Sequence, residues 1–247
     1  MDYAVISRQG GRPLNEDSYS ISKKGGSYCF TVCDGLGGHA KGEVASQTAS
    51  EVFKDTFEDY DGKPSAFFDS AFKECAEEFR RLAGESPVLE LMKTTVVSAV
   101  ADSKKISFTH IGDSRLYGFT PEKAELFTDD HSVPEMLVKT GEITKDEIRN
   151  HPDRNKLLRC LAVSDEPADY EPVREKTVKN YSAFLLCTDG FWELIDEKTM
   201  LRCLKWSKNA EQWLELMTRR VERAGRGRQT DNYTAIAVFT GKGVTLK

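Results

Sequence analysis

The 247-residue sequence has no long apolar run, no excess of basic residues and no closely paired cysteines. A membrane-spanning helix needs about 20 consecutive apolar residues, and no stretch approaches that length. The first residues, MDYAVISRQGG, also lack the apolar region of a signal peptide. The net charge of −5 argues against a nucleic-acid surface, which requires a basic stripe. We therefore expect a cytoplasmic protein that engages neither membrane nor nucleic acid.

The basic residues and the cysteines that are present need an interpretation. An arginine run spans residues 219–228, and we interpret it as a solvated helix end. The six cysteines are scattered, mostly within apolar segments, which predicts buried free thiols in a reducing compartment. Cys29, Cys33 and His39 form a partial zinc-ligand set, but the fourth ligand that a structural zinc site requires is missing.

The sequence also lacks a Pro/Gly/Ser-rich linker, so we expect a single domain over residues 1–247. Alternating strand and helix patterns predict an α+β fold with a mostly antiparallel sheet. The three predicted strands between Thr94 and Phe119 are joined by short turns, so we expect them to pair antiparallel with one another. Strands are predicted at Tyr3–Ile6, Tyr19–Ser22, Ser27–Cys33, Thr94–Ala101, Lys105–Ile111, Arg115–Phe119, Ala183–Cys187 and Tyr233–Phe239, and helices at Val133–Thr140, Thr144–Asn150, Glu197–Leu204 and Ala210–Val221.

Aspartates recur where predicted strands begin or end. The stretch from Tyr28 to Ser46 reads as a buried strand that stops on Asp34, a glycine turn and a helix start. Each aspartate alone is more typical of a turn than of a ligand site. The full set at such junctions comprises Asp17, Asp34, Asp113, Asp189 and Asp231.

If the strands stack into one sandwich, these carboxylates meet at one end of it and require cations to coexist. Oxygen ligands without metal-spaced His or Cys favour hard ions, Mg²⁺ or Mn²⁺, and a pair of such ions suits phosphoryl chemistry. Arg12 could supply a forked guanidinium for the phosphate, or it could be an ordinary surface arginine.

One competing motif is present. The segment from Gly35 to Ala40 formally matches the dinucleotide fingerprint GxGxxA, with Asp55 about 20 residues further on. That interpretation requires a parallel βαβ unit. It also places Asp34 beside a pyrophosphate and Asp55 within a helical pattern, so we disfavour an oxidoreductase.

Taken together, the motifs resemble the metal-dependent Ser/Thr protein phosphatases of the 2C family, in their compact bacterial form. The matching pieces follow the family's order along nearly the whole chain. They are RPLNED (12–17), CDGLGGHAKGEVAS (33–46), KTTVVSAV (93–100), HIGDSRLYGF (110–119), DDHS (129–132), LCTDGFWELI (186–195) and TDNYTAIAV (230–238).

The resemblance implies a four-layer α-β-β-α sandwich of two antiparallel sheets flanked by helix pairs, with a mobile flap at about residues 131–163. It implies that Asp34 bridges two Mn²⁺ or Mg²⁺ ions and that the Gly35 carbonyl binds one of them. Asp189 and Asp231 would hold the other ion. The remaining implied roles are phosphate binding for Arg12, water or metal binding for the acidic pair Glu16 and Asp17, and a weaker third ion for Asp113.

The implied activity is hydrolysis of phosphoserine and phosphothreonine in proteins by a hydroxide that bridges the two ions. Substrates would be phosphoproteins made by an opposing Ser/Thr kinase, and the chain would act as a monomer. Leu36 stands where some members carry a histidine proposed as general acid, and His39 does not inherit that role by default. A non-catalytic regulatory domain of the same fold is the alternative, but such a domain would be expected to lose metal ligands.

Overall fold

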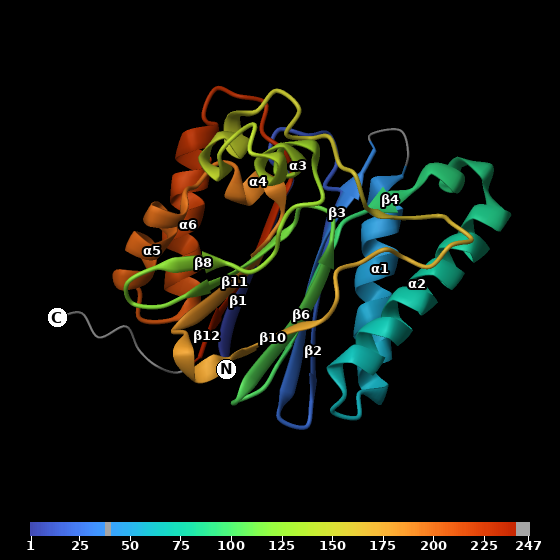
Figure 1. Ribbon diagram of the computed structural model, residues 1–247, viewed down its shortest axis with the longest axis horizontal. Helices are drawn as coiled ribbons and strands as arrows, with labels where there is room; N and C mark the ends of the chain where they lie inside the picture. The colour runs from blue at the N-terminus through green and yellow to red at the C-terminus, as the bar shows by residue number, and fades with distance from the viewer. Residues whose placement is uncertain (38–40, 241–247) are drawn as a thin grey trace.

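The computed structural model describes residues 1–37 and 41–240, and within them every strand pairing is antiparallel. The strands form two sheets that lie between two helical layers (Figure 1). The sheets pack face to face in the middle of the molecule. This is the four-layer sandwich that the family resemblance implies.

The first sheet has five strands in the order β1-β12-β11-β7-β8. Its first pair joins the two ends of the described chain, from Asp2 opposite Phe239 to Arg8 opposite Tyr233. The strands are β1 (Asp2–Arg8), β7 (Arg115–Phe119), β8 (Ala124–Leu126), β11 (Ala183–Cys187) and β12 (Tyr233–Phe239).

The second sheet has seven strands, in the order β10-β6-β5-β3-β4-β9 with β2 also paired to β3. The β2–β3 hairpin closes at Gly25-Gly26. The strands are β2 (Asp17–Lys24), β3 (Ser27–Leu36), β4 (Lys93–Thr94), β5 (Val96–Ala101), β6 (Lys105–Ile111), β9 (Leu161–Ala162) and β10 (Arg174–Thr177).

Each sheet carries its own pair of helices on its outer face (Figure 1). α1 (Gly42–Thr56) packs on β2 and β3, and α2 (Pro64–Glu85) packs on α1. On the other side α6 (Ala210–Gly225) covers β1 and β12 and contacts α5 (Glu197–Lys205). The short helices are α3 (Val133–Thr140), α4 (Asp189–Trp192), η1 (Phe57–Asp59), η2 (Pro87–Leu91), η3 (Lys145–Asn150) and η4 (Val178–Asn180).

Side-chain caps and apolar spacing explain where the helices begin and what they bury. The Asp196 carboxylate accepts from the Thr199 amide at 2.7 Å, and Asn209 caps α6 in the same way. Buried side chains gather in three clusters, one under each helical layer and one between the sheets. The inter-sheet cluster includes Phe30, Phe108, Leu116, Phe184 and Ile236.

Two sequence expectations about the strands are wrong, and one alternative that we disfavoured is excluded. β3 does not stop at Asp34 but continues to Leu36, because Gly35 and Leu36 pair with Thr94 and Lys93 of β4. β7 does not pair with β6, since the chain crosses from the second sheet to the first between them. The parallel βαβ unit of the dinucleotide interpretation is excluded, because β3 pairs antiparallel with β2, β4 and β5.

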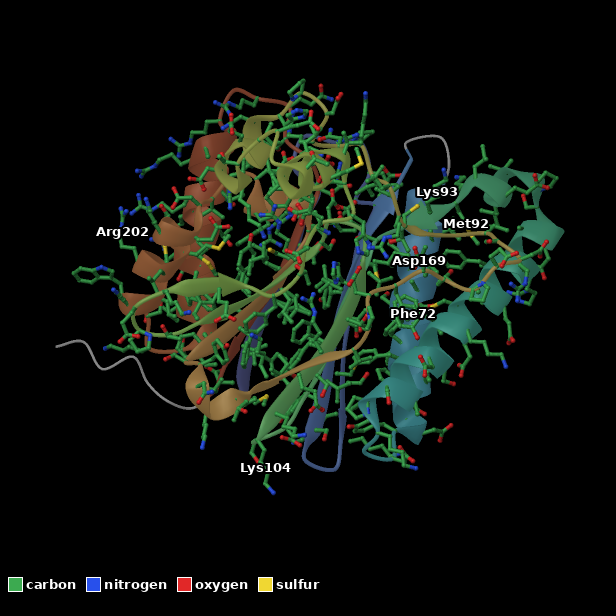
Figure 2. The ribbon with its side chains drawn as sticks, viewed as in Figure 1. Phe72, Met92, Lys93, Lys104, Asp169 and Arg202 are labelled. Atoms are coloured by element: carbon green, nitrogen blue, oxygen red, sulfur yellow. The ribbon has the colours of Figure 1, made fainter. Side chains whose placement is uncertain are left out.

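The long polar region between β8 and β11 has more structure than its sequence suggests. The predicted helix Val133–Thr140 is confirmed as α3, and the next helical segment forms η3. Beyond β9 the chain runs back over α2, where the Tyr170 ring stacks on Phe72 with ring centres 4.0 Å apart. Figure 2 shows neighbouring Asp169 close to Phe72 on that helix. In the described part of the chain, no helix has the length and apolarity to cross a membrane.

Candidate metal centre

Asp17 and Asp34 face each other across the β2–β3 pair. They are register partners in an antiparallel ladder, so their side chains lie on the same face. Thr95 fixes the end of β3, because its hydroxyl accepts from the Asp34 amide at 3.0 Å. Like charges placed directly opposite destabilise a sheet unless something compensates them. This pair therefore requires a cation or protons.

Glycine is required where β3 meets the start of β2 and of α1. The Gly35 amide donates to the Glu16 carbonyl at 3.1 Å. A Cβ at Gly35 would collide with the carbonyls of Glu16 and Gly42, and a Cβ at Gly42 would lie 2.6 Å from the Gly35 carbonyl carbon. The two glycines thus allow backbone, not side chain, to approach the carboxylates.

Asp189 and Asp231 enter from the first sheet. Asp189 opens α4 two residues after the end of β11, and Asp231 lies two residues before the start of β12, the strand that pairs with β11. The Asp231 carboxylate accepts from the Asn232 amide at 2.8 Å. A Cβ at Gly190 would collide with the Asn232 carbonyl, so the two segments meet backbone to backbone.

Asp113 occupies the crossover between the two sheets. Gly112, with φ +102°, turns the chain there, and the buried Trp192 indole donates to the Asp113 carbonyl at 3.0 Å. The Asp113 side chain itself is buried. The crossover that the sequence interpretation took for a hairpin turn is what brings this aspartate between the sheets.

These segments converge on a pocket of about 120 Å³. Aspartates from both sheets contribute to it, together with Arg12 and the backbone around Gly35. Asp17 lies next to this group, as its electrostatic interaction with Asp34 shows. The lining residues are Arg12, Glu16, Asp34, Gly35, Leu36, Gly37, Asp113, Asn155, Leu157, Asp189 and Asp231.

Burial and mutual repulsion oppose ionisation of the clustered carboxyl groups. The pKa of Asp34 lies well above its usual value, first because of burial and then because of the charge on Asp189. Burial is also the largest cause that raises the pKa of Asp17 to about 8 and that of Asp189 to about 7. The pKa of Asp113 is raised well above its usual value for the same reason. The cluster therefore attracts positive charge strongly.

The donor set fits hard divalent cations. Asp17 Oδ1 and Asp189 Oδ1 are buried and accept no hydrogen bond from the described residues, which leaves two oxygens without a partner. Carboxylate and carbonyl oxygens are the ligands that Mg²⁺ and Mn²⁺ prefer. Across residues 1–37 and 41–240, no three acidic, His or Cys side chains already close around a single point. A bound cation would therefore draw the carboxylates inward.

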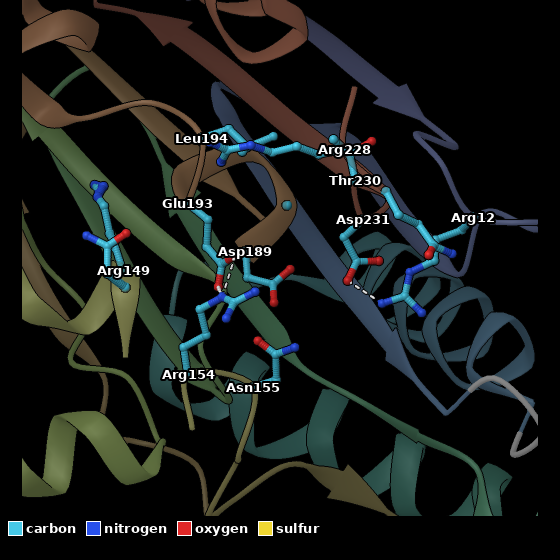
Figure 3. A pocket seen from close by; sticks show the side chains of 13 residues that line it. Arg12, Arg149, Arg154, Asn155, Asp189, Glu193, Leu194, Arg228, Thr230 and Asp231 are labelled. Carbon is cyan, nitrogen blue, oxygen red and sulfur yellow. Dashed lines mark hydrogen bonds and ion pairs between the residues drawn. The ribbon is translucent and has the colours of Figure 1, made fainter. Parts of the chain in front are cut away.

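Arg12 lies at the rim of the pocket and binds Asp231. Its Nη2 is 2.6 Å from Asp231 Oδ2, and this contact is the largest cause that raises the pKa of Arg12. The Arg12 side chain is 42% exposed, so part of its guanidinium remains accessible from solvent. Figure 3 shows the Arg12–Asp231 contact beside Asp189. The phosphate-binding candidate and a metal-ligand candidate are thus neighbours.

Two positioning residues were missed from the sequence. Asn232 accepts from the Glu16 amide at 2.8 Å and donates to the carbonyls of Gln9 and Leu14, which ties β12 to the loop that carries Arg12. The Thr188 hydroxyl donates to Asp17 Oδ2 at 2.9 Å across the two sheets. The only sequence signal for Asn232 and Thr188 was that each directly neighbours an aspartate, in the segments TDN and CTDG.

Among the described residues, no histidine or cysteine lines this pocket. His131 accepts from the Gly112 amide at 3.1 Å and contacts Glu171, and burial is the main cause that lowers its pKa to about 4. Cys33 and Cys187 are buried, and burial raises the pKa of both thiols, so they are neutral packing groups. His39 lies outside the described residues. Among the described residues that line the metal pocket, none is a histidine.

The comparisons with known proteins identify the family of this chain. Residues 7–232 match the protein phosphatase 2C family. The chain therefore belongs to that family, as its motifs imply. It is similar to the serine/threonine phosphatase stp of Listeria innocua, with 29% identity over 234 residues that cover 92% of this chain and 90% of that protein.

Solved structures give the same result. The fold is similar to a bacterial serine phosphatase with a TM-score of 0.88 and 26% identity, covering 97% of this chain and 98% of that chain. It is also similar to the catalytic domain of the phosphatase PstP in complex with two manganese ions. That match has a TM-score of 0.80 and 27% identity, and it covers 96% of each chain.

Proposed function

We propose that this protein is a metal-dependent phosphatase that hydrolyses phosphoserine and phosphothreonine in proteins. One observation carries the proposal. Aspartates from both sheets line or adjoin one pocket, and two of their buried carboxylate oxygens accept no hydrogen bond from the described residues. The stp of Listeria innocua is named a serine/threonine phosphatase, and the PstP structure holds two manganese ions, which supports the same chemistry here.

When bound, two Mn²⁺ or Mg²⁺ ions would neutralise phosphate oxygens and lower the pKa of the water that attacks phosphorus. Asp34 would contact both ions, with the Gly35 carbonyl on one and Asp189 and Asp231 on the other. The acidic pair Glu16 and Asp17 would orient water at the site. We assign Asp113, together with Asp189, to a weaker third ion.

Arg12 would bind the substrate phosphate. Its planar guanidinium can donate two parallel hydrogen bonds to phosphate oxygens, and its partly exposed side chain lines the metal pocket. The Arg12–Asp231 contact supports this role, because it holds the guanidinium beside the metal ligands before substrate arrives.

The flap over residues 131–163 would form one wall of the active site. Asn155 and Leu157 line the metal pocket, and Arg154 pairs with Glu193 after α4. Arg149 of η3 donates to the Trp192 carbonyl at 3.0 Å. We propose that the flap is part of a single domain over residues 1–247. The protein would act as a monomer in the cytoplasm and would oppose a Ser/Thr kinase.

The test is hydrolysis of p-nitrophenyl phosphate and a phosphothreonine peptide by purified protein. Activity should require Mn²⁺ or Mg²⁺, disappear in EDTA and return when the metal is restored. Alkylation with iodoacetamide should leave the rate unchanged, since Cys33 and Cys187 are buried neutral thiols. Activity that survives EDTA and is lost on alkylation would refute the metal mechanism.

The alternative is a non-catalytic regulatory domain with the same fold. The intact set of aspartates argues against it, because a domain without catalysis has no need to maintain buried like charges. Calorimetric titration with Mn²⁺ separates the two. A folded protein that binds no Mn²⁺ would favour the regulatory alternative.

A further inference from the structure

A second and larger pocket opens beside the metal pocket. Its volume is about 610 Å³, and it shares Arg12, Asn155, Asp189 and Asp231 with the metal pocket. A phosphorylated side chain that reaches the metal centre would therefore hold its neighbouring residues in this larger space. We call it the arginine pocket, and its lining residues are Arg12, Arg149, Asn150, Arg154, Asn155, Asp189, Gly190, Glu193, Leu194, Arg228, Gln229, Thr230 and Asp231.

The arginines of this pocket have different partners. Arg149 uses both of its terminal nitrogens, because Nη1 donates to the Trp192 and Ile195 carbonyls and Nη2 contacts Glu197 at 2.7 Å. Arg154 uses its Nε on Glu193 at 3.1 Å, and its terminal nitrogens bind no other described residue. Both arginines therefore bind other residues of the pocket wall, and the terminal nitrogens of Arg154 can still donate hydrogen bonds.

Arg228 differs from the others. Within residues 1–37 and 41–240, no side chain or carbonyl pairs with its guanidinium. Arg226, two residues earlier and also exposed, does not line the pocket. In the view of Figure 3, Arg228 lies along the wall at Leu194, Arg154 lies on the opposite side, and Asp189 lies between them. Part of the arginine run interpreted as a solvated helix end thus faces the active site.

The charge of the pocket favours an anion. Its acidic groups are Asp189, Asp231 and Glu193. Two of these are the metal-ligand candidates, whose charge a bound cation would neutralise, and Glu193 is already paired with Arg154. Arg228 then remains as an unpaired cation in a concave site, where attraction for an anion is stronger than on an open surface.

We propose that the arginine pocket selects substrates with a second anionic group within about three residues of the phosphorylated one, and that Arg228 determines this specificity. The inference rests on the proposed phosphatase activity and adds a substrate class to it. A carboxylate and a second phosphate share the chemistry that a forked guanidinium recognises.

The test compares three phosphothreonine peptides of equal length with Mn²⁺ present. One has neutral flanking residues, one has glutamates, and one carries a second phosphoserine. Wild type should have a kcat/KM about tenfold higher for the anionic peptides, as expected for one charge-assisted hydrogen bond. The preference should shrink as salt concentration rises. Preference for the doubly phosphorylated peptide alone assigns the pocket to phosphate, whereas preference for both assigns it to anions in general.

Arg228→Gln should remove this preference and leave the rates on the neutral peptide and on p-nitrophenyl phosphate unchanged. Arg226→Gln is the matched control, because it deletes the same charge from the same loop outside the pocket, and it should retain the preference. Equal loss in both variants would indicate a general field effect and overturn the proposal. Equal treatment of all three peptides by wild type would overturn it as well.

A binding measurement separates this inference from the proposed activity. Non-hydrolysable phosphonate versions of the peptides can be titrated calorimetrically into wild type and Arg228→Gln. Selective binding that depends on Arg228 supports the pocket even if no peptide is hydrolysed, an outcome that would refute only the catalytic proposal. Binding that does not distinguish the peptides refutes the pocket whatever the rates.

Discussion

At the scale of single residues, the β2–β3 hairpin places the carboxylate of Asp34 directly opposite that of Asp17. Asp34→Asn keeps the size of the side chain but removes the charge that would bridge the ions. We expect kcat on a phosphopeptide to fall by at least about a thousandfold, since several kcal/mol of transition-state stabilisation depend on the ions. Steady-state kinetics and the Mn²⁺ content of the purified variant measure the effect.

The matched control is Asp55→Asn, which removes an exposed carboxylate from α1. It should leave the rate and the metal content unchanged. Wild-type rate together with full Mn²⁺ content in Asp34→Asn would exclude Asp34 as the bridging ligand.

Arg12 can be tested separately from the metals. Arg12→Ala should raise KM about tenfold or more and change kcat much less, because a charged hydrogen bond to phosphate contributes about 1.5–3 kcal/mol. Mn²⁺ affinity should not fall, since Arg12 now competes for Asp231 Oδ2. Arg12→Lys should restore KM only in part, because the point charge lacks the fork. An unchanged KM in Arg12→Ala would argue against phosphate binding.

The aspartates could be found from sequence because each lies close to an end of a predicted strand. Asn232 and Thr188 could not. Asn232 acts on the Glu16 amide, 216 residues away in the chain, and Thr188 acts on Asp17 from the other sheet. Nothing local in the sequence specifies such partners, since only the folded pairing of β11 and β12 brings them into reach.

At the scale of elements, the crossover from β6 to β7 shows the limit of local patterns. Two apolar strands separated by Gly112-Asp113-Ser114 are equally consistent with a hairpin and with a step to a second sheet. The strands β8, β9 and β10 were missed for a related reason. They are short, and β10, with the sequence REKT, depends on its pairing with β6 from Arg174↔Phe108 onward.

Gly112→Ala tests whether this crossover positions Asp113. The residue has φ +102°, and an added Cβ would lie 2.5 Å from Thr95 Cγ2. Backbone strain and overpacking together should lower the free energy of unfolding by about 2–5 kcal/mol. Urea denaturation measures the loss.

Gly26→Ala, in a turn where a Cβ meets nothing within 4 Å, is the control and should be close to neutral. A Gly112→Ala variant as stable as wild type would mean that the crossover can relax, and Asp113 would then not depend on this turn.

At the scale of the whole molecule, the candidate metal centre lies between the two sheets. Asp17 and Asp34 come from one sheet, and Asp189 and Asp231 come from segments that flank the other. Each sheet has its own helices and its own apolar cluster. This four-layer arrangement could be expected from the family resemblance. The step of the chain from one sheet to the other between β6 and β7 could not be expected, because it depends on which sheet edge each strand pairs with.

Cation binding should therefore stabilise the fold in a pH-dependent way. The pKa of Asp17, about 8, and that of Asp189, about 7, lie above the unfolded value of about 3.9. Without metal, the folded chain binds more protons than the unfolded chain between about pH 4 and 8. These groups then make stability fall as pH rises through that window.

Mn²⁺ replaces those protons, so it should stabilise the protein more at pH 8 than at pH 5. At a concentration of about 100 Kd the gain is about 2.7 kcal/mol, or about 5–10 °C in Tm. Thermal melts with and without Mn²⁺ at the two pH values measure it, and Asp34→Asn should show little shift. An equal Mn²⁺ shift at both pH values would contradict the assignment.

The fluorescence of the buried Trp192 indole should report on cation binding at the aspartates. The indole N–H binds the Asp113 carbonyl, and the Arg115 guanidinium carbon lies 3.4 Å from its ring centre. A change of charge at the aspartates therefore changes the electric field at a buried fluorophore. Trp206, by contrast, is 69% exposed and far more accessible to an aqueous quencher such as iodide. Emission recorded in the presence of iodide should follow Mn²⁺ binding in wild type and in Trp206→Phe, and this signal should disappear in Trp192→Phe.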